Sequence, residues 1–359
     1  MNYLERFYAC MNYEPVDHVP FWEWGGWPET NERWIKEGFR PGVDDLAMGA
    51  DSRIFLTNWF FPNPPFEREV VEQDEEHILY INHEGILMRE MVKNPWSSMP
   101  QFVRFPVETP EEFRAFWAKK MQADLTKRIS PDWQNQLKGY REMKSPLVIF
   151  ADRWGGFFGP LRNMLGVERL SELFYDDPDF LEEMMDANAD FIIQIMDQVL
   201  DVVSIDMFAF WEDMAYNTAP LLSPQMARKY MLPRYKRVID HLSRRGVPFF
   251  GLDSDGQMDP LIPIWMDAGI NTLWPFEVQS GMDVNAVRKK YGKGLRMWGG
   301  IDKRAIAWGL DDIEKELARV KPLMLEGGYI PHPDHSIPPD TSFQNFLYFQ
   351  RRLKEECGA

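Results

Sequence analysis

The chain has 359 residues, of which 45% are hydrophobic and 14% aromatic, which is enough apolar material for a large core. Its net charge of −16 argues against nucleic acid or an anionic membrane as the main partner, because phosphate groups must be met by clustered Lys and Arg. No apolar run reaches the roughly 20 residues that span a bilayer, and the N-terminus lacks the pattern of a secretory signal, so we expect a cytoplasmic protein.

The first half of the chain is predicted to contain single strands, an inserted β-meander and charged helices. Thr109 precedes Glu111 and Glu112, which is typical of a helix N-cap. The strand-and-turn pattern of 66–72, 77–83 and 85–92 predicts an inserted β-meander. The remaining expected elements are strands at 18–24, 51–59 and 146–151, and helices at 1–6, 31–37 and within 110–144.

The second half alternates regularly between strands and helices. A helical region at 167–200 breaks near Asp177-Pro178, and a last helix covers 342–354. Between them, strands are expected at 202–211, 247–256, 271–276, 295–298 and 329–331, and helices at 223–245, 259–268, 283–291, 301–308 and 311–325. Eight strand-helix units without an internal repeat favour one (β/α)8 TIM barrel over 1–359, with a β-meander near 66–92, rather than two smaller domains.

The strand at 247–256, VPFFGLDSDG, ends in two acids and a glycine. Catalytic groups of a barrel collect at the carboxyl ends of its strands, where Asp253 and Asp255 would lie. The two side chains are two positions apart, so they point the same way in extended chain and could share a cation or a proton. The sequence therefore predicts that this strand end organises the site.

Many polar residues follow the predicted strands and would gather at the same face. Carboxylates crowded there repel, which raises their pKa values unless a cation, Arg153 or Lys303 compensates. The gathered residues are Glu23, Asn58, Asp152, Arg153, Glu212, Asp213, Asp253, Asp255, Glu277, Asp302, Lys303, His332, Asp334 and His335.

Four of these residues form a candidate metal site. Three carboxylates and one imidazole suit zinc, manganese or iron, and zinc is the first expectation. Single residues of this face also fit structural roles: Asp255 in a turn with Gly256, Asp302 as the cap of the helix at 301–308, and His335 as a satisfied loop histidine. The candidate ligands are Asp253, Asp255, Glu277 and His335.

Tryptophans also lie near the predicted strand ends. Six of them at one rim could line a pocket for a flat or apolar ligand, although each alone fits core or rim packing. Cys10 and Cys357 are too few for a thiolate metal cluster, and we expect buried spectators. The tryptophans are Trp22, Trp24, Trp59, Trp154, Trp211 and Trp274, and the predicted substrate-binding residues are Glu23, Trp24, Asn58, Trp59, Arg153, Trp154, Trp211 and Glu212.

Five motifs carry a family resemblance. They are EPVDHVPFW at 14–22, SPQMARKYMLPRYKRVID at 223–240, GLDSDG at 251–256, GGIDKRAIAWG at 299–309 and HSIPPDTSFQN at 335–345. In this order they resemble the uroporphyrinogen decarboxylase superfamily over nearly the whole chain. The resemblance implies a (β/α)8 barrel and either of two activities: porphyrinogen decarboxylation, or cobalamin-dependent methyl transfer with a metal at the barrel mouth.

The sequence departs from the decarboxylase pattern at two places. The arginine-rich motif that grips substrate carboxylates has no counterpart in FWEWGGWPET at 21–30, and the catalytic aspartate falls on Asn58. A neutral amide cannot supply the electrostatics of a carboxylate. His335 does match a histidine of the decarboxylase closing motif.

The methyltransferase pattern is also altered. Its His-x-Cys and closing Cys correspond here to Asp253, Asp255 and His335. Oxygen and nitrogen ligands lack the thiolate character of zinc enzymes that activate thiols, and they suit a Lewis acid that polarises the leaving oxygen or nitrogen of a methyl donor. The resemblance thus implies catalytic roles for Asp255, Glu277 and His335, with Glu277 as a fourth ligand or general acid.

We therefore expect a metal-dependent methyltransferase that moves a methyl group from a small O- or N-methylated compound to a corrinoid (cobalamin) partner protein. A decarboxylase of the porphyrinogen type is the first alternative. A non-catalytic small-ligand or corrinoid binding protein is the second, because fold does not fix function. The sequence leaves monomer and homodimer open.

Overall fold

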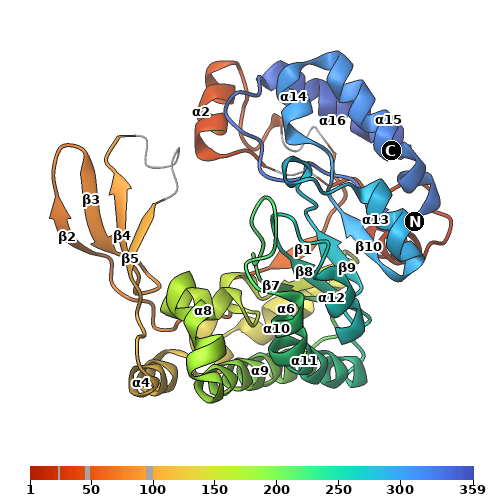
Figure 1. Ribbon diagram of the computed structural model, residues 1–359. Coiled ribbons are helices and arrows are strands. Elements are labelled where there is room, and N and C mark those ends of the chain that lie inside the picture. Colours follow the sequence, from red (N-terminus) through yellow and green to blue (C-terminus); the bar gives the residue numbers. More distant parts are fainter. Residues whose placement is uncertain (23–24, 45–48, 94–99) are drawn as a thin grey trace.

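The computed structural model describes residues 1–22, 25–44, 49–93 and 100–359 (Figure 1). Its largest sheet has seven strands in the order β1-β6-β7-β8-β9-β10-β11, and each neighbouring pair is parallel. All four residues of β6 are buried, as expected for a parallel strand covered on both faces. The strands are β1 Ile54–Leu56, β6 Leu147–Phe150, β7 Met207–Trp211, β8 Phe249–Asp253, β9 Thr272–Trp274, β10 Arg296–Trp298 and β11 Tyr329–Ile330.

Helices connect successive strands of this sheet, which confirms the predicted alternation. The expected helix at 223–245 contains one π-helical turn, Ala227–Met231, just before Pro233, which has no N–H for the regular helical ladder. Helices α9, α11 and α12 lie together along one side of the strands (Figure 1). The connections are α7 Gly159–Leu165, α8 Val167–Asp176, α9 Pro178–Leu200, α10 Pro224–Met226, α11 Leu232–Arg244, α12 Ile262–Ala268, α13 Val284–Tyr291, α14 Lys303–Trp308 and α15 Leu310–Glu326, and α16 Phe343–Cys357 ends the chain.

The interior of the curled sheet is filled by aromatic side chains. Trp274 and Trp298 stack with ring centroids 4.9 Å apart, and Trp22 lies edge-on to Trp298 at 4.8 Å. Helix α1, Tyr3–Met11, adds Phe7, Cys10 and Met11 to the same cluster. The molecule has a packed centre beneath the carboxyl ends of the strands, so the space for a ligand lies above this layer.

The expected first strand at 18–24 is not a strand in its described part. Phe21 and Trp22 are buried, but the Phe21 N–H donates to the Asp51 side chain, and its carbonyl accepts from the Asp51 N–H. Pro20 has no N–H, and Val19 bonds to the end of α16 at Cys357. These bonds replace a strand ladder, so the described parallel sheet has seven strands where the sequence predicts eight.

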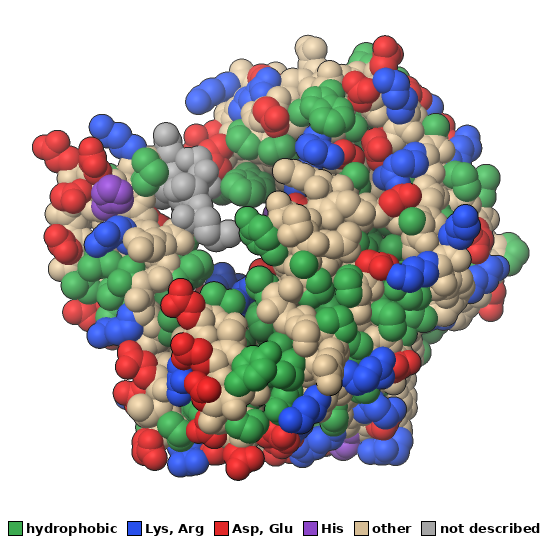
Figure 2. Space-filling view, in the orientation of Figure 1, with side chains coloured by type: hydrophobic (Ala, Val, Ile, Leu, Met, Phe, Trp, Pro, Cys, Tyr) green, Lys and Arg blue, Asp and Glu red, His purple; other side chains and the backbone are tan. Residues whose placement is uncertain are grey.

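The predicted insertion is present and larger than expected. It is an antiparallel sheet of four strands: β2 Glu69–Gln73, β3 His77–Ile81, β4 Leu87–Met91 and β5 Gln101–Arg104. The short fourth strand was not expected from sequence. Figure 1 shows this sheet projecting from the remainder of the molecule, and Figure 2 shows the surface hollowed between the two.

Two junctions tie the inserted sheet to the parallel one. The indole Nε1 of Trp154 donates to Glu84 Oε2 at 2.7 Å, and Phe66 stacks on Phe116 with centroids 6.1 Å apart. Phe116 belongs to α4, which starts at the predicted cap: Thr109 Oγ1 accepts from Glu112 N, and Glu112 Oε2 accepts from Thr109 N. The remaining helices are α2 Pro28–Lys36, α4 Pro110–Lys120, α5 Leu125–Arg128 and α6 Trp133–Glu142.

Two further sequence predictions, the helix break near Asp177 and the buried cysteines, are confirmed. Helix α8 ends and α9 begins on either side of Asp177, whose carboxylate accepts from Phe180 N. Cys10 and Cys357 are buried and free. Among the described helices, none combines the length and the apolar character that a membrane crossing would need.

Candidate active site

The carboxyl ends of β7 and β8 bring three aspartates together. Asp253 is the last residue of β8 and is the register partner of Trp211 on β7, while Asp213 lies two residues after Trp211. Beyond Asp255, Gly256 has a φ of +82°, and a Cβ there would come within 2.5 Å of the Ala215 carbonyl oxygen. This turn therefore needs glycine, and it holds Asp255 against the loop that follows β7.

Asp255 forms an ion pair with His335 from the segment after β11. Asp255 Oδ2 lies 3.4 Å from His335 Nε2, and the two side chains are 35% and 34% exposed. A small molecule can therefore reach both groups. The Asp255 carboxylate accepts a hydrogen bond from His335, and this raises the pKa of His335 above its ordinary value and favours the imidazolium form. Burial acts in the opposite direction.

The other two aspartates lie beside this pair and are partly buried. Burial raises the pKa of Asp253 well above its ordinary value, and the charges of Asp255 and Asp213 raise it further, while a hydrogen bond from Trp274 opposes them. Burial and the Asp255 charge also raise the pKa of Asp213, although Arg162 lowers it. These carboxyls thus favour a bound proton or a bound cation at the end of β8.

Glu277, after β9, is held by two groups. Ser280 Oγ donates to its Oε2 at 2.9 Å, and Lys303 Nζ lies 3.4 Å from its Oε1. Asp334 is fully buried and accepts from the backbone N–H groups of Val278 and Lys303. Burial raises the pKa of Asp334 to about 6. Asp334 therefore fixes the loops after β9 and β10, and with them the position of Glu277.

Some predicted residues of this face have structural roles. Asp302 caps α14 by accepting from Arg304 N, which is the structural role that its sequence position allowed. His332 is buried, and its Nδ1 lies 2.7 Å from the Pro333 carbonyl oxygen. Asp152 has a φ of 51° and is the first residue of a 3₁₀ turn, Asp152–Trp154, and burial raises its pKa.

Three of the predicted substrate-binding residues are buried. Glu212 accepts from the backbone N–H groups of Phe157, Phe158 and Gly159 and from the Tyr235 hydroxyl. Trp59 and Trp154 belong to the main core, where Trp154 is fully covered and bonds to Glu84. In this conformation a substrate therefore cannot reach the side chains of Trp59, Trp154 and Glu212.

The other predicted substrate residues are better placed. Asn58 is exposed after β1, with a φ of 69°. Arg153 and Trp211 line a cavity of about 730 Å³ that Asp213 also borders. Glu23 and Trp24 lie outside the described residues.

One site residue was missed from sequence because its helix was missed. Arg162 lies on α7, where it donates to the carbonyl and carboxylate oxygens of Asp213, and its guanidinium lies 5.1 Å from the Trp211 ring centre. The only local signal was a cationic residue in an otherwise apolar stretch, which does not reveal its partner.

The proposed metal ligands do not form a ready-made cluster. Among the residues that the structure describes, no three His, Cys, Asp or Glu side chains come together in a way that could hold a metal ion. Asp255 is engaged by His335, and Glu277 is engaged by Lys303. The four residues would have to move to share one ion, so ligation by Asp253, Asp255, Glu277 and His335 stays a prediction.

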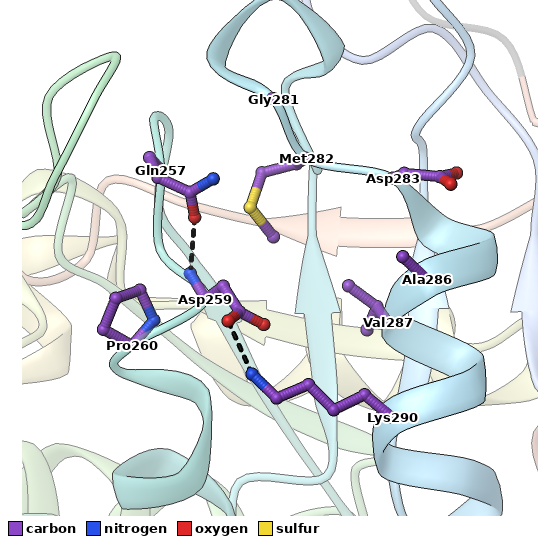
Figure 3. Close-up of a pocket in the computed structure, with 9 residues that line it drawn as sticks. All are labelled: Gln257, Asp259, Pro260, Gly281, Met282, Asp283, Ala286, Val287 and Lys290. Carbon is purple, nitrogen blue, oxygen red and sulfur yellow. Dashed lines mark hydrogen bonds and ion pairs between the residues drawn. The ribbon is translucent and has the colours of Figure 1, made fainter.

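A second, smaller cavity of about 360 Å³ lies beside α13 (Figure 3). Lys290 Nζ donates to Asp259 Oδ2 at 2.6 Å, and the Asp259 N–H donates to Gln257 Oε1 at 3.0 Å. Asp259 thus bonds to two other polar residues of the wall, and none of the predicted catalytic residues lines the cavity. The carboxyl ends of β7 and β8 are the better candidate for the active site.

Comparison with known proteins places this geometry in a family. The model of the family described as uroporphyrinogen decarboxylase (URO-D) matches residues 154–355, which is more than half of the chain. The chain belongs to the uroporphyrinogen decarboxylase family. The matched region contains β7 to β11 and therefore all the described residues of the Asp213, Asp253, Asp255 and His335 group.

Solved structures support the fold. A methyltransferase from Methanosarcina mazei is similar over 100% of both chains, with a TM-score of 0.64 and 17% sequence identity. A second structure, KGPDC from Streptococcus mutans, matches 57% of this chain and 85% of its own at 15% identity, with a TM-score of 0.25. No curated protein matches the sequence. At these identities the likeness shows a shared fold and no more.

Proposed function

We propose that this protein is a methyltransferase that removes a methyl group from a small O- or N-methylated compound and passes it to a corrinoid (cobalamin) carried by a partner protein. The observation that carries the proposal is the partly exposed pair of Asp255 and His335 beside the partly buried carboxyl of Asp253. Membership of the URO-D family and the shared fold with a protein described as a methyltransferase support it.

The pair suits the departure of a methylated oxygen or nitrogen. As the methyl group leaves for the acceptor, the bond between carbon and the leaving atom breaks and both of its electrons stay on that atom. His335 then gives its proton to the leaving atom, and Asp255 stabilises the imidazolium beforehand. General acid catalysis of this kind typically contributes about 10²- to 10⁴-fold to a rate.

Neighbouring groups support the proton donor. Desolvation and the charges of two neighbouring aspartates raise the pKa of Asp253, so it favours a bound proton and can return one to the pair after turnover. Glu277 is held by Ser280 and Lys303 and lies near enough to His335 for its charge to act on that imidazole. It is the second proposed acid. Trp211 and Arg153 bind the substrate from the cavity side.

A divalent metal is a further part of the proposal, with zinc as the first candidate. Asp253, Asp255, Glu277 and His335 supply hard oxygen atoms and one imidazole nitrogen, a donor set that suits such an ion. They do not converge among the described residues, so the proton transfer above uses the chain's own groups. A bound ion would require His335 to be neutral and would itself polarise the leaving atom in place of the His335 proton. Elemental analysis of untagged protein, with Asp255→Ala and His335→Ala in parallel, tests the site: about one ion per chain in the parent and none in either variant is expected.

The activity test is methyl transfer from methylated donors to free, chemically reduced cobalamin, followed by the change in its visible absorption. His335→Gln should lower the rate by about 100-fold while the protein remains folded by circular dichroism. Lys315→Gln, which removes an exposed cation on α15, is the matched control and should not change the rate. Equal rates in His335→Gln and the parent would refute the role of His335.

The decarboxylase alternative has its own test. Asn58 replaces the expected catalytic aspartate, and it is exposed rather than held in a charged site. Release of carbon dioxide from uroporphyrinogen by the parent, or its appearance in Asn58→Asp, would favour this alternative. Tight ligand binding without turnover of any donor would favour a binding protein.

A further inference from the structure

The cavity of about 730 Å³ continues the candidate active site towards the inserted sheet. Trp211 and Asp213 form its inner wall, and they stand next to Asp253 through the pairing of β7 with β8. Phe102 and Phe105, at and just beyond β5, form part of its outer wall. Its volume lies within the range of about 300 to 1,000 Å³ that is typical of small-molecule sites.

The cavity wall is largely apolar and includes three arginines: Arg162 pairs with Asp213, Arg169 pairs with Glu172, and Arg153 lies over Trp211. Phe105, Leu165 and Trp211 offer contact to a flat apolar group. Arg153 lies 6.0 Å above the Trp211 ring centre, and its side chain is 39% exposed. An arginine on such a wall is the usual means of fixing the orientation of a ligand that carries an acid.

The guanidinium of Arg153 has donors to spare. Its Nη2 lies 3.3 Å from Glu84 Oε1, and its Nε is buried with no hydrogen-bond partner among the described residues. Arg162, by contrast, already donates to Asp213. Arginine has five N–H donors in a fork that matches a carboxylate, so Arg153 can accept a second anion.

We infer that this cavity binds the non-reacting end of a methylated carboxylic acid, with the acid group on Arg153 and an apolar body against Trp211. This inference rests on the proposed methyl transfer for the position of the methyl group. The Asp255 carboxylate repels a carboxylate, whereas Arg153 attracts it, so the acid points away from the strand ends. The methylated oxygen or nitrogen then faces Asp255 and His335.

Binding of 4-hydroxybenzoate, the demethylated form of 4-methoxybenzoate, tests the inference by titration calorimetry without any turnover. The parent should bind it, and should bind the neutral 4-hydroxybenzamide at least about 10-fold more weakly, because a hydrogen bond to a charged group is lost. Arg153→Gln should weaken binding of the acid by about 10-fold or more and leave binding of the amide unchanged.

Two further variants separate the charge effect from damage to the fold. Glu84→Gln keeps an oxygen acceptor for Trp154 and removes the anion beside Arg153, so the acid should bind more tightly. Arg114→Gln, which removes an exposed cation that pairs with Glu183 on α9, should bind the acid as the parent does. Equal binding of acid and amide by the parent, or unchanged binding of the acid by Arg153→Gln, would overturn the inference.

Measuring both ligand binding and methyl transfer distinguishes failure of the cavity assignment from failure of the proposed function. If the acid binds in a way that depends on Arg153 but 4-methoxybenzoate is not demethylated, the cavity assignment is supported and the proposed methyl transfer is not. Methyl transfer with a KM that Arg153→Gln does not change supports the activity and overturns the cavity assignment. No binding of the acid at millimolar concentration also overturns the cavity assignment.

Discussion

Replacing Glu212 by alanine should destabilise the protein strongly. Its carboxylate is fully buried and accepts from three consecutive backbone N–H groups, Phe157 to Gly159, and from the Tyr235 hydroxyl. A Cβ at Gly156 would come within 2.7 Å of the carboxylate, so the loop fits closely around it. Glu212 is therefore the anion on which the loop before α7 is built.

The magnitude follows from the groups left behind. Glu212→Ala strands four buried donors, and each unsatisfied buried group costs about 1 to 3 kcal/mol. Removing the carboxylate also removes the cost of burying a charge, which offsets part of that sum. We expect a net loss of about 3 to 5 kcal/mol in the free energy of unfolding, a large share of the roughly 5 to 15 kcal/mol typical of a protein.

Urea denaturation followed by far-UV circular dichroism measures this loss. Tyr235→Phe removes only one donor and should cost about 1 kcal/mol, while Glu142→Ala, an exposed acid at the end of α6, should stay within about 0.5 kcal/mol of the parent. Amide hydrogen exchange at Phe157 to Gly159 should accelerate in Glu212→Ala. A loss below about 1 kcal/mol for Glu212→Ala would refute the reasoning.

Three further predictions concern titration and the turn after β8. Burial lowers the pKa of His332 to about 3, below its ordinary value of 6.5, so the unfolded chain takes up this proton first and His332 withdraws stability as the pH falls. Between pH 6.5 and about 4.5 the unfolding free energy of the parent should therefore fall by about 2 to 3 kcal/mol more than that of His332→Gln, measured by urea denaturation at each pH; equal slopes would contradict this. Asp255→Asn should lower the pKa of His335 in an NMR titration, since the Asp255 hydrogen bond is the main cause of its raised pKa, and an unchanged pKa would count against the pair. Gly256→Ala should lower the unfolding free energy by about 1 kcal/mol or more, because its φ of +82° and the nearby Ala215 carbonyl exclude a Cβ, and Gly246→Ala, whose φ is +91° in open space, measures the strain alone.

The order of elements was largely determined by the sequence. Strand and helix periodicities are local properties, so the alternation from β6 to α16, the cap at Thr109 and the break at Asp177 could be predicted. The position of Asp253 and Asp255 at the end of β8 follows from the same local pattern. Short or irregular elements were not predictable in this way, and β5, α7 and the non-strand course of 18–22 were assigned incorrectly or missed.

Tertiary structure decided which of the similar acids are available for chemistry. Glu212 and Asp255 both follow strands of the parallel sheet, yet one is enclosed by the loop before α7 and the other is open beside His335. The difference depends on burial and on partners that are distant in the sequence, such as Tyr235, so no local pattern contains it. The sequence also pointed to Arg153, but its cavity depends on distant segments. The inserted sheet and helices α7 and α8 together form the wall around that residue.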